Sequence, residues 1–244
     1  MALVALSALA AACVQATTGL GFALVLTPAA FALLPPEGAI VAVTVLGLVL
    51  NVLVLGGERR RPVVAWREIG PMLLAAAPGA VCGVLVLRAL PKPVLQIAVG
   101  LAVIGAALLR VRAGAGAVSP GSPPARIALG FASGTLTTSA GVNGPPIALW
   151  LTRRGLGPAE VRDSLSAAFL GLGVIGVVAL VPVLDHAKLS LGLLLASAAC
   201  VVAGHAVGSR AFARLEARRY EPLLLAVIVA AGVASVVGGA IAAT

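Results

Sequence analysis

The stretch Ser139-Ala140-Gly141-Val142-Asn143-Gly144-Pro145-Pro146 interrupts an otherwise apolar segment at residues 127–152. Proline lacks the backbone N–H of a regular helix and clashes with the preceding turn, and glycine loosens the backbone. Backbone groups left unpaired are tolerated at membrane depth only where protein covers them or where they line a polar cavity. The stretch therefore predicts a helix broken within the membrane, a feature of substrate sites in transporters. The alternative is a proline kink with no role in binding.

An earlier stretch, Thr17-Thr18-Gly19-Leu20-Gly21-Phe22, has the same character and is followed by Thr27-Pro28. Gly19 and Gly141 are 122 residues apart, which is half of the 244-residue chain. These correspondences predict two repeats, at about residues 1–122 and 123–244, within a single integral membrane domain. Further pairs related by offsets of 122 or 125 residues are Pro36 and Pro158, Thr44 and Ser166, Gly70 and Gly192, Gly79 and Gly204, and Gly83 and Gly208.

The composition is that of a membrane protein. Of the residues, 61% are hydrophobic and only 10% are charged, and apolar runs long enough to span a bilayer recur along the chain. The net charge of +9 does not indicate nucleic-acid binding, because the basic residues are confined to short loops and aromatic residues make up only 3%. We assign this charge to membrane orientation and contact with anionic headgroups. Three cysteines without a CxxC pair and only two histidines predict neither a metal nor another cofactor.

We expect an all-α polytopic protein with eight apolar segments, four in each half. The first segment is expected to be interrupted twice, at Thr17-Thr18-Gly19 and at Thr27-Pro28. Its Ala10-Ala11-Ala12-Cys13 run resembles a lipoprotein cleavage site, but no Lys or Arg precedes it, so we treat it as part of the mature protein. A Gly-, Ser-, Pro- and Arg-rich linker at 110–126 is expected to be mobile and solvated. The segments are expected at 2–34, 39–55, 69–87, 94–109, 127–152, 161–184, 189–209 and 222–243.

The positions of the basic residues distinguish two membrane topologies. If all eight segments crossed the membrane, Lys and Arg would divide 8 against 9 between the two sides, contrary to the positive-inside rule. If the two broken segments instead enter and leave on one side, each half has a re-entrant segment and three crossings, and the halves are inverted relative to each other, as in many secondary transporters. We therefore expect 14 of the 17 basic residues to be cytoplasmic, in loops 59–67, 110–126, 153–162 and 210–219.

The predicted spans contain no mid-membrane carboxylate, because all eight acidic residues lie in or beside loops, and this argues against a cation pathway. An anion can be bound by half-helix N-termini together with neighbouring hydroxyl and amide donors. For most single Ser and Thr residues, a bond to a carbonyl of their own helix is the competing interpretation. The residues expected to bind substrate are Thr17, Thr18, Gly19, Gly21, Thr44, Thr138, Ser139, Gly141, Asn143, Gly144 and Ser166. Further donors on these segments are Gln15, Thr27, Asn51, Ser133, Thr137 and Ser164.

His205 lies near the end of the seventh segment and is a candidate for proton coupling, because intramembrane ionisable residues are commonly functional. A neutral, hydrogen-bonded packing histidine is an equally good interpretation. Trp66 and Trp150 are expected at the membrane interfaces, where indole rings are common. Two Gly-x-x-x-Gly pairs predict faces for close helix packing, Gly79 with Gly83 and Gly204 with Gly208.

The two glycine motifs carry a resemblance to a known family. Gly19-Leu20-Gly21-Phe22 with Pro28, and Gly141-Val142-Asn143-Gly144-Pro145-Pro146, each open a half and are followed by a Pro-containing turn and a Thr- or Ser-bearing helix. In this the chain resembles the sulfite exporter TauE/SafE family of membrane permeases over nearly its whole length. It departs from the fuller Gly-Gly run of that family, because Phe22 and Asn143 occupy glycine-like positions and Pro145-Pro146 come early. The resemblance implies transport of sulfur-containing anions such as sulfite, sulfonates or sulfoacetate across the bacterial inner membrane.

These features together favour a secondary transporter rather than an enzyme, with a small anion and the lipid bilayer as partners and homo-oligomerisation left open. The alternative is an anion channel, or a membrane subunit transporting another small organic anion. An intramembrane enzyme would need a nucleophile with a base, or paired carboxylates, inside the spans. Cys200 and His205 are five residues apart on one helix and are poorly placed as neighbours.

Overall fold

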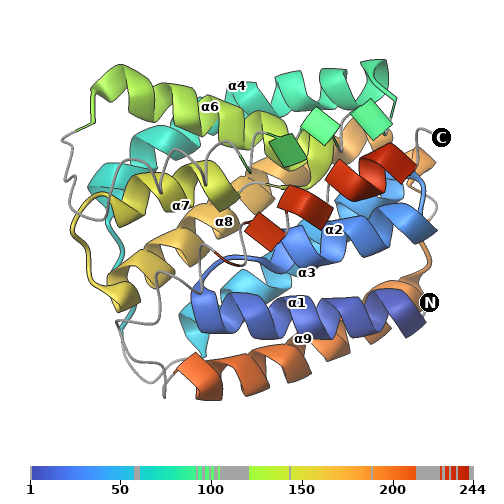
Figure 1. Ribbon diagram of the computed structural model, residues 1–244, viewed down its shortest axis with the longest axis horizontal. Coiled ribbons are helices and arrows are strands. Elements are labelled where there is room, and N and C mark those ends of the chain that lie inside the picture. The colour runs from blue at the N-terminus through green and yellow to red at the C-terminus, as the bar shows by residue number, and fades with distance from the viewer. Residues whose placement is uncertain are drawn as a thin grey trace.

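The computed structural model describes residues 2–57, 61–91, 93–94, 97–98, 100–101, 104, 121–142, 144–187, 189–212, 226, 229–230, 232–234 and 236–241. All regular structure in these residues is helical, which confirms the all-α prediction (Figure 1). Most of the predicted segment 94–109 and of the linker 110–126, and nearly half of the predicted segment 222–243, lie outside them. The principal elements are α1 (Ala2–Thr18), α2 (Phe22–Leu33), α3 (Pro36–Gly56), α4 (Trp66–Ala89), α6 (Pro123–Ala140), α7 (Gly144–Thr152), α8 (Pro158–Leu180), the 3-10 helix η1 (Val181–His186) and α9 (Leu191–Phe212).

Four stretches of the described chain are long and apolar enough to cross a membrane: α3, α4, the continuous run Pro158–Asp185 formed by α8 and η1, and Leu191–Arg210 of α9. Their outward faces carry large apolar side chains. On α4, for example, Leu74 is 80% exposed, and Val81 and Leu85 follow it at helical spacing. Stripes of this kind match a lipid environment, because a contiguous apolar face of this size is rare in water. The fold is that of a multi-pass membrane protein.

The predicted break in the second half is confirmed. α6 ends at Ala140, and Gly141 follows in the left-handed conformation with φ 66°. The N–H groups of Gly141 and Val142 return to carbonyls of the last turn of α6 at 3.2 Å, which closes that helix end. Pro145 and Pro146 stand in the first turn of α7, where a missing N–H removes no helical hydrogen bond. The prolines thus begin a new helix rather than kinking an old one.

The first half is broken once, not twice. α1 ends at Thr18, and Gly19 (φ 78°) and Gly21 (φ 123°) turn the chain into α2. The second predicted interruption, at Thr27-Pro28, is wrong, because α2 continues through both residues to Leu33. A proline removes one helical hydrogen bond, but its fixed φ is helical, and packing against neighbouring helices can hold such a helix together.

Each broken segment folds back on itself as a hairpin. In Figure 1, α1 and α2 run in opposite directions, as do α6 and α7, and the two hairpins open toward opposite ends of the bundle. The described parts of the loops predicted to be basic (residues 61–65, 121–122 and 153–157) and the end of α9 lie together at one end, on the left of Figure 1. The turns at 34–35, 90–91 and 187–190 lie at the other end.

The predicted glycine faces join helices of different halves. α4 packs along α6, and α9 packs along α1, with the paired helices parallel (Figure 1). A Cβ atom on Gly79 or Gly83 would overlap the carbonyl of Phe131 or Thr135 on α6. A Cβ atom on Gly204 or Gly208 would likewise overlap the carbonyl of Leu9 or Cys13 on α1. Small residues here allow the helix backbones to touch, the main way in which helices pack in lipid.

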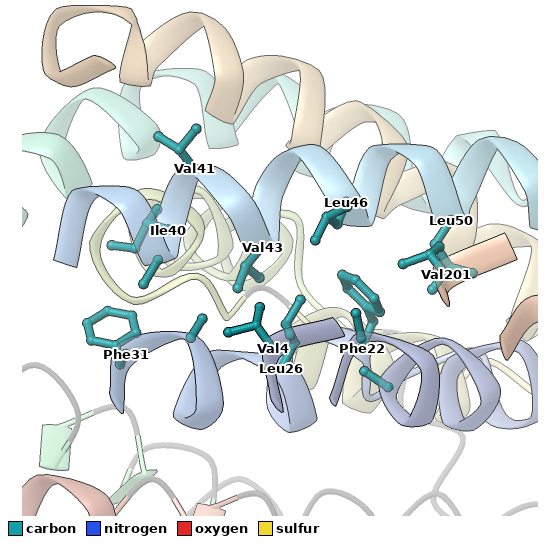
Figure 2. Packing of buried hydrophobic residues seen from close by; sticks show 14 of the residues in the cluster. Val4, Phe22, Leu26, Phe31, Ile40, Val41, Val43, Leu46, Leu50 and Val201 are labelled. Carbon is teal, nitrogen blue, oxygen red and sulfur yellow. The ribbon is translucent and has the colours of Figure 1, made fainter. Parts of the chain in front are cut away.

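α3 lies at the centre of the first hydrophobic cluster. Figure 2 shows its apolar side chains meeting α2, the start of α1 and one residue of α9. The residues labelled there are Val4, Phe22, Leu26, Phe31, Ile40, Val41, Val43, Leu46, Leu50 and Val201. A second cluster joins α4, α7 and α8 to the tip of the first hairpin at Leu20. The tips of both hairpins are therefore enclosed by α3 and α8.

Candidate functional site

A small cavity lies where the two hairpins meet α3 and α8. Its volume is about 20 Å³, room for roughly one water molecule. Both broken segments, α3 and α8 contribute to its wall. The lining residues are Gln15, Phe22, Ala23, Val43, Thr44, Gly47, Asn51, Thr137, Gly141, Phe169 and Gly173.

The lining positions from the two halves correspond to each other. Gln15 and Thr137 are 122 residues apart, as are Gly47 and Phe169, and Asn51 and Gly173. This is the offset that relates Gly19 to Gly141 in the sequence. The side chains at matched positions differ, so the first half supplies two carboxamides where the second supplies a hydroxyl and no side chain. The cavity wall therefore uses equivalent positions of the two halves, but only the first half contributes carboxamide side chains to it.

A continuous chain of hydrogen bonds runs along the carboxamide side of the cavity. The backbone N–H of Phe22, at the start of α2, donates to Gln15 Oε1 at 3.2 Å. Gln15 Nε2 donates to Asn51 Oδ1 at 2.8 Å, and Asn51 Nδ2 donates to the Gly47 carbonyl at 2.7 Å. A backbone donor at one end and a backbone acceptor at the other fix the orientation of both amides. Each amide nitrogen keeps a second N–H that these bonds do not use.

The two hydroxyls that line the cavity donate to their own helices. Thr44 Oγ1 donates to the Ile40 carbonyl at 2.7 Å, and Thr137 Oγ1 donates to the Ser133 carbonyl at 2.6 Å. Their oxygens remain as acceptors, so in this arrangement an anion would be met by the carboxamide N–H groups first. A bound anion could also recruit either hydroxyl by rotation away from its helix carbonyl.

The structure brings only part of the predicted set to the cavity. Thr44 and Gly141 line it. Thr138 and Ser139 do not; they donate to the carbonyls of Ala80 and Thr135, both at 2.7 Å. Asn143 lies outside the described residues, as do the side chains of Thr17 and Thr18. Gln15, Asn51 and Thr137 line the cavity although they were predicted only as further donors.

The remaining predicted glycines shape the breaks rather than the cavity wall. Gly19 adopts a positive φ and packs against Arg162, and Gly21 also has a positive φ. A Cβ atom on Gly144 would overlap the side chain of Leu20. Ser166 is fully buried on α8, but it is not among the residues that line the cavity.

Several buried hydroxyls on these elements have no hydrogen-bond partner in the part of the chain that the structure describes: Thr27, Ser133 and Ser166. The Thr27 hydroxyl adjoins the second break, since a Cβ atom on Gly141 would lie 3.3 Å from Thr27 Oγ1. Buried polar groups without a partner are rare and call for a ligand, an ion or a water. Thr27 thus offers a spare donor beside a residue of the cavity wall.

Arg162 falls both in the loop predicted at 153–162 and in the segment predicted at 161–184, and the structure places it in the helix. α8 begins at Pro158, and Arg162 is fully buried within its second turn. Its Nε donates to the Ala16 carbonyl at 3.1 Å, so the cation lies at the carbonyl end of α1, where the helix dipole favours it. The adjacent Asp163 is also buried and accepts the Val63 N–H at 2.9 Å. The burial of Arg162 has no local signal in the sequence, because it comes from packing against Ala16 and Gly19 of the first half.

His205 is placed away from the cavity wall. Its Nε2 would lie 3.2 Å from a Cβ atom on Gly57, the residue that ends α3. This is the end of the bundle that carries the basic loops (Figure 1). A role for His205 in proton coupling is a prediction from the sequence.

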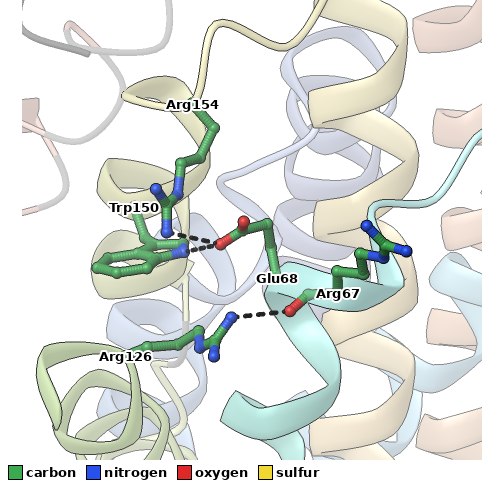
Figure 3. A network of polar contacts seen from close by, with 5 residues as sticks. All are labelled: Arg67, Glu68, Arg126, Trp150 and Arg154. Carbon is green, nitrogen blue, oxygen red and sulfur yellow. Dashed lines mark hydrogen bonds and ion pairs between the residues drawn. The ribbon is translucent and has the colours of Figure 1, made fainter. Parts of the chain in front are cut away.

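A polar cluster ties α7 to the start of α4 at the same end of the bundle (Figure 3). Glu68 Oε2 accepts Trp150 Nε1 at 2.8 Å and Arg154 Nη2 at 2.9 Å, and the Arg154 guanidinium lies 4.3 Å from the centre of the Trp150 ring. Arg126 Nη1 donates to the Arg67 carbonyl at 2.9 Å beside it. Trp150 is only 8% exposed, whereas Trp66 is 61% exposed.

A comparison with protein families gives one match across the chain. The family model described as sulfite exporter TauE/SafE matches residues 4–235. Searches of curated proteins and of solved structures give no match. The matched range includes both breaks, α3 and α8, and hence every residue of the cavity wall.

Proposed function

Because the chain belongs to the sulfite exporter TauE/SafE family, a family of membrane transporters, we propose that it is a secondary transporter for small sulfur-containing anions such as sulfite or organosulfonates. The anion binds between the tips of the two hairpins. One observation carries this proposal: a single cavity is lined by both breaks and by α3 and α8. Broken helices that converge on a buried polar cavity are the common substrate site of secondary transporters.

The chemistry of the cavity wall suits an oxyanion. The carboxamides of Gln15 and Asn51 each keep an N–H for an anion oxygen, and Thr27 adds a buried hydroxyl near the second break. The start of α2 lies in the wall, where its amides and dipole favour negative charge. Since the cavity holds about one water, binding requires the hairpin tips to separate. That separation is a natural first step of alternating access.

The proposal extends to the arrangement of the halves as inverted repeats of one hairpin and three crossings each. The opposite directions of the hairpins support it (Figure 1). The glycine contacts between the halves also support it. Gly79 of the first half meets Phe131 of the second, and Gly204 of the second half meets Leu9 of the first; Phe131 and Leu9 are 122 residues apart. The basic loops lie at one end, and the positive-inside rule supports a cytoplasmic position for that end in a bacterial inner membrane.

Thermal unfolding of the purified protein with a panel of anions tests the substrate class. The panel contains sulfite, thiosulfate, taurine, sulfoacetate and simple carboxylates. A ligand that binds only the folded state stabilises the protein, and the stabilisation grows with the ratio of ligand concentration to Kd. We expect selective stabilisation by a sulfur oxyanion, and saturable flux of it in proteoliposomes. Non-saturating flux would indicate a channel, and no response in folded protein would refute the proposed substrate class.

A matched pair of threonines tests the location of the site. Thr137 and Thr152 each donate to the carbonyl four residues earlier, but only Thr137 lines the cavity. Thr137→Val is expected to weaken anion binding, whereas Thr152→Val leaves it unchanged. Equal effects of the two variants would move the site away from this cavity.

Single cysteines read by a membrane-impermeant thiol reagent test the topology, after the native cysteines are replaced. Exposed positions Val63 and Gly155 should react from the cytoplasmic side, and Ser190 and Leu90 from the other. Labelling of Val63 and Gly155 from opposite sides would contradict the inverted-repeat topology.

A further inference from the structure

Among the residues that the structure describes, the cavity wall includes no ionisable side chain. Its described lining consists of two carboxamides, two hydroxyls, two phenylalanine rings and small or aliphatic residues. The residues of the breaks whose side chains lie outside the described set, Thr17, Thr18 and Asn143, are also neutral by sequence. No side-chain cation of the wall is therefore available to balance the charge of an anion.

Two described charges beside the hairpin tips are bonded to backbone groups and are not among the residues that line the cavity. Arg162 and Asp163 are adjacent on α8 and both are buried. Arg162 donates to the carbonyl end of α1, and Asp163 accepts the Val63 N–H in the loop before α4. Glu68 and Arg154 form an ion pair at the end of the bundle. None of these four side chains is among the residues that line the cavity.

The helix ends at the breaks supply the remaining field. The carbonyl ends of α1 and α6 are closed, the first by Gly19 N–H to Gln15 O at 2.7 Å and by Arg162, the second by the N–H groups of Gly141 and Val142. α2 and α7 begin at the same breaks, so their N-terminal amide groups lie there. Each such amide end is equivalent to roughly half a positive charge and each carbonyl end to roughly half a negative one, so the field left at the breaks offsets at most about one negative charge.

Resting on the proposed function, we infer that this site takes singly charged oxyanions and discriminates against doubly charged ones. Its cargo is then hydrogensulfite, or a sulfonate with no second charge, rather than the sulfite dianion, sulfate or thiosulfate. A second negative charge would enter a poorly polarisable pocket with no counter-charge, where the desolvation penalty of an ion exceeds what neutral donors return.

A comparison of isoelectronic anions at several pH values tests this inference. Chlorate has the pyramidal shape of sulfite but a single charge at every pH used, whereas sulfite changes from singly to doubly charged near neutral pH. We expect the apparent Kd of total sulfite, read from thermal stabilisation, to weaken about tenfold per pH unit above that ionisation. The Kd of chlorate should stay constant between pH 6 and 9, and sulfate should not stabilise the protein.

The outcomes separate this inference from the proposed function. Two results would overturn the single-charge inference and leave sulfur-anion transport standing. One is a Kd of sulfite that, like that of chlorate, does not change with pH. The other is sulfate binding as tight as sulfite binding. Absence of stabilisation by any sulfur oxyanion, in folded protein, would refute the proposed function itself. Chlorate corrects for titration of the protein, because any pH effect shared by both anions belongs to the protein and not to the cargo.

A pair of variants at one position gives an independent reading. Asn51→Asp is nearly isosteric but brings a carboxylate to the wall, and Asn51→Ser is smaller and neutral. We expect Asn51→Asp to abolish binding of sulfite and chlorate at pH 8 and Asn51→Ser to weaken it only partly. Equal loss in both variants, each shown to be folded by a cooperative melting transition without ligand, would contradict a site governed by charge.

Discussion

Gln15 and Asn51, which are 36 residues apart on α1 and α3, share a 2.8 Å hydrogen bond between their carboxamides at the wall of the cavity. Both side chains are buried. Through this bond the tip of the first hairpin is attached to α3, which has the largest buried share of the four stretches able to cross a membrane. The same bond leaves one N–H of each amide for a ligand. The two side chains therefore both stabilise the hairpin and offer donors to the site.

The pair should show strong coupling in a double-mutant cycle. Gln15→Leu or Asn51→Leu alone leaves a buried amide without its partner, which costs about 1–3 kcal/mol. We expect the double variant to cost less than the sum of the single variants, by about 0.5–3 kcal/mol. Thermal or denaturant unfolding in detergent measures the cycle. Strict additivity would show that the bond contributes nothing to the folded state.

The glycines at the helix contacts should resist any added side chain. Gly83→Ala and Gly208→Ala each place a methyl group on a backbone carbonyl of the neighbouring helix, and each is expected to destabilise the protein by about 1–3 kcal/mol. Gly70 and Gly192 serve as controls, because a Cβ atom at either position meets nothing within 4 Å. Gly70→Ala, within α4, should be neutral or slightly stabilising. A loss of stability at Gly70 as large as at Gly83 would show that helix contact is not the cause.

The buried Arg162 should not tolerate lysine. Arg162→Lys keeps the charge but removes the Nε donor to the Ala16 carbonyl, and we expect a loss of about 1.5–3 kcal/mol because the bond involves a charged group. Arg210 provides the matched control, since it donates to the Ala206 carbonyl at 2.8 Å from an exposed position. Arg210→Lys should change the unfolding free energy by less than about 0.5 kcal/mol. A similar small effect at both positions would refute a structural role for Arg162 at the end of α1.

The cluster of Glu68, Trp150 and Arg154 should contribute modestly and in a salt-dependent manner. The Glu68 and Arg154 side chains are 23% and 16% exposed, so their ion pair is partly screened by solvent. Glu68→Gln should cost up to about 1 kcal/mol at low salt, and the difference from wild type should shrink as salt is added. Unfolding at low and high ionic strength measures this. A cost that does not change with salt would assign the effect to the Trp150 hydrogen bond instead of the ion pair.

The sequence by itself determined the features that depend on local backbone chemistry. Gly141 and Gly19 mark the breaks because glycine adopts positive φ at little cost, and the apolar runs that became α3, α4, α8 and α9 are legible from composition. The prolines were harder to interpret, since Pro145 and Pro146 open a helix whereas Pro28 lies inside one. A proline is compatible with either position, and the local sequence does not state which neighbours will hold the helix.

Only the tertiary structure decided which polar side chains share the cavity. Thr138 and Ser139 stand beside the second break in the chain, yet their hydroxyls point to carbonyls of α4 and of their own helix. Gln15 and Asn51 reach the cavity because α1, α3, α6 and α8 converge there. Arg162 is buried for the same reason, as α8 meets the end of α1 across 146 positions of sequence. Glycine and proline act on the residues next to them, whereas burial and hydrogen-bond partners depend on residues that only the fold brings together.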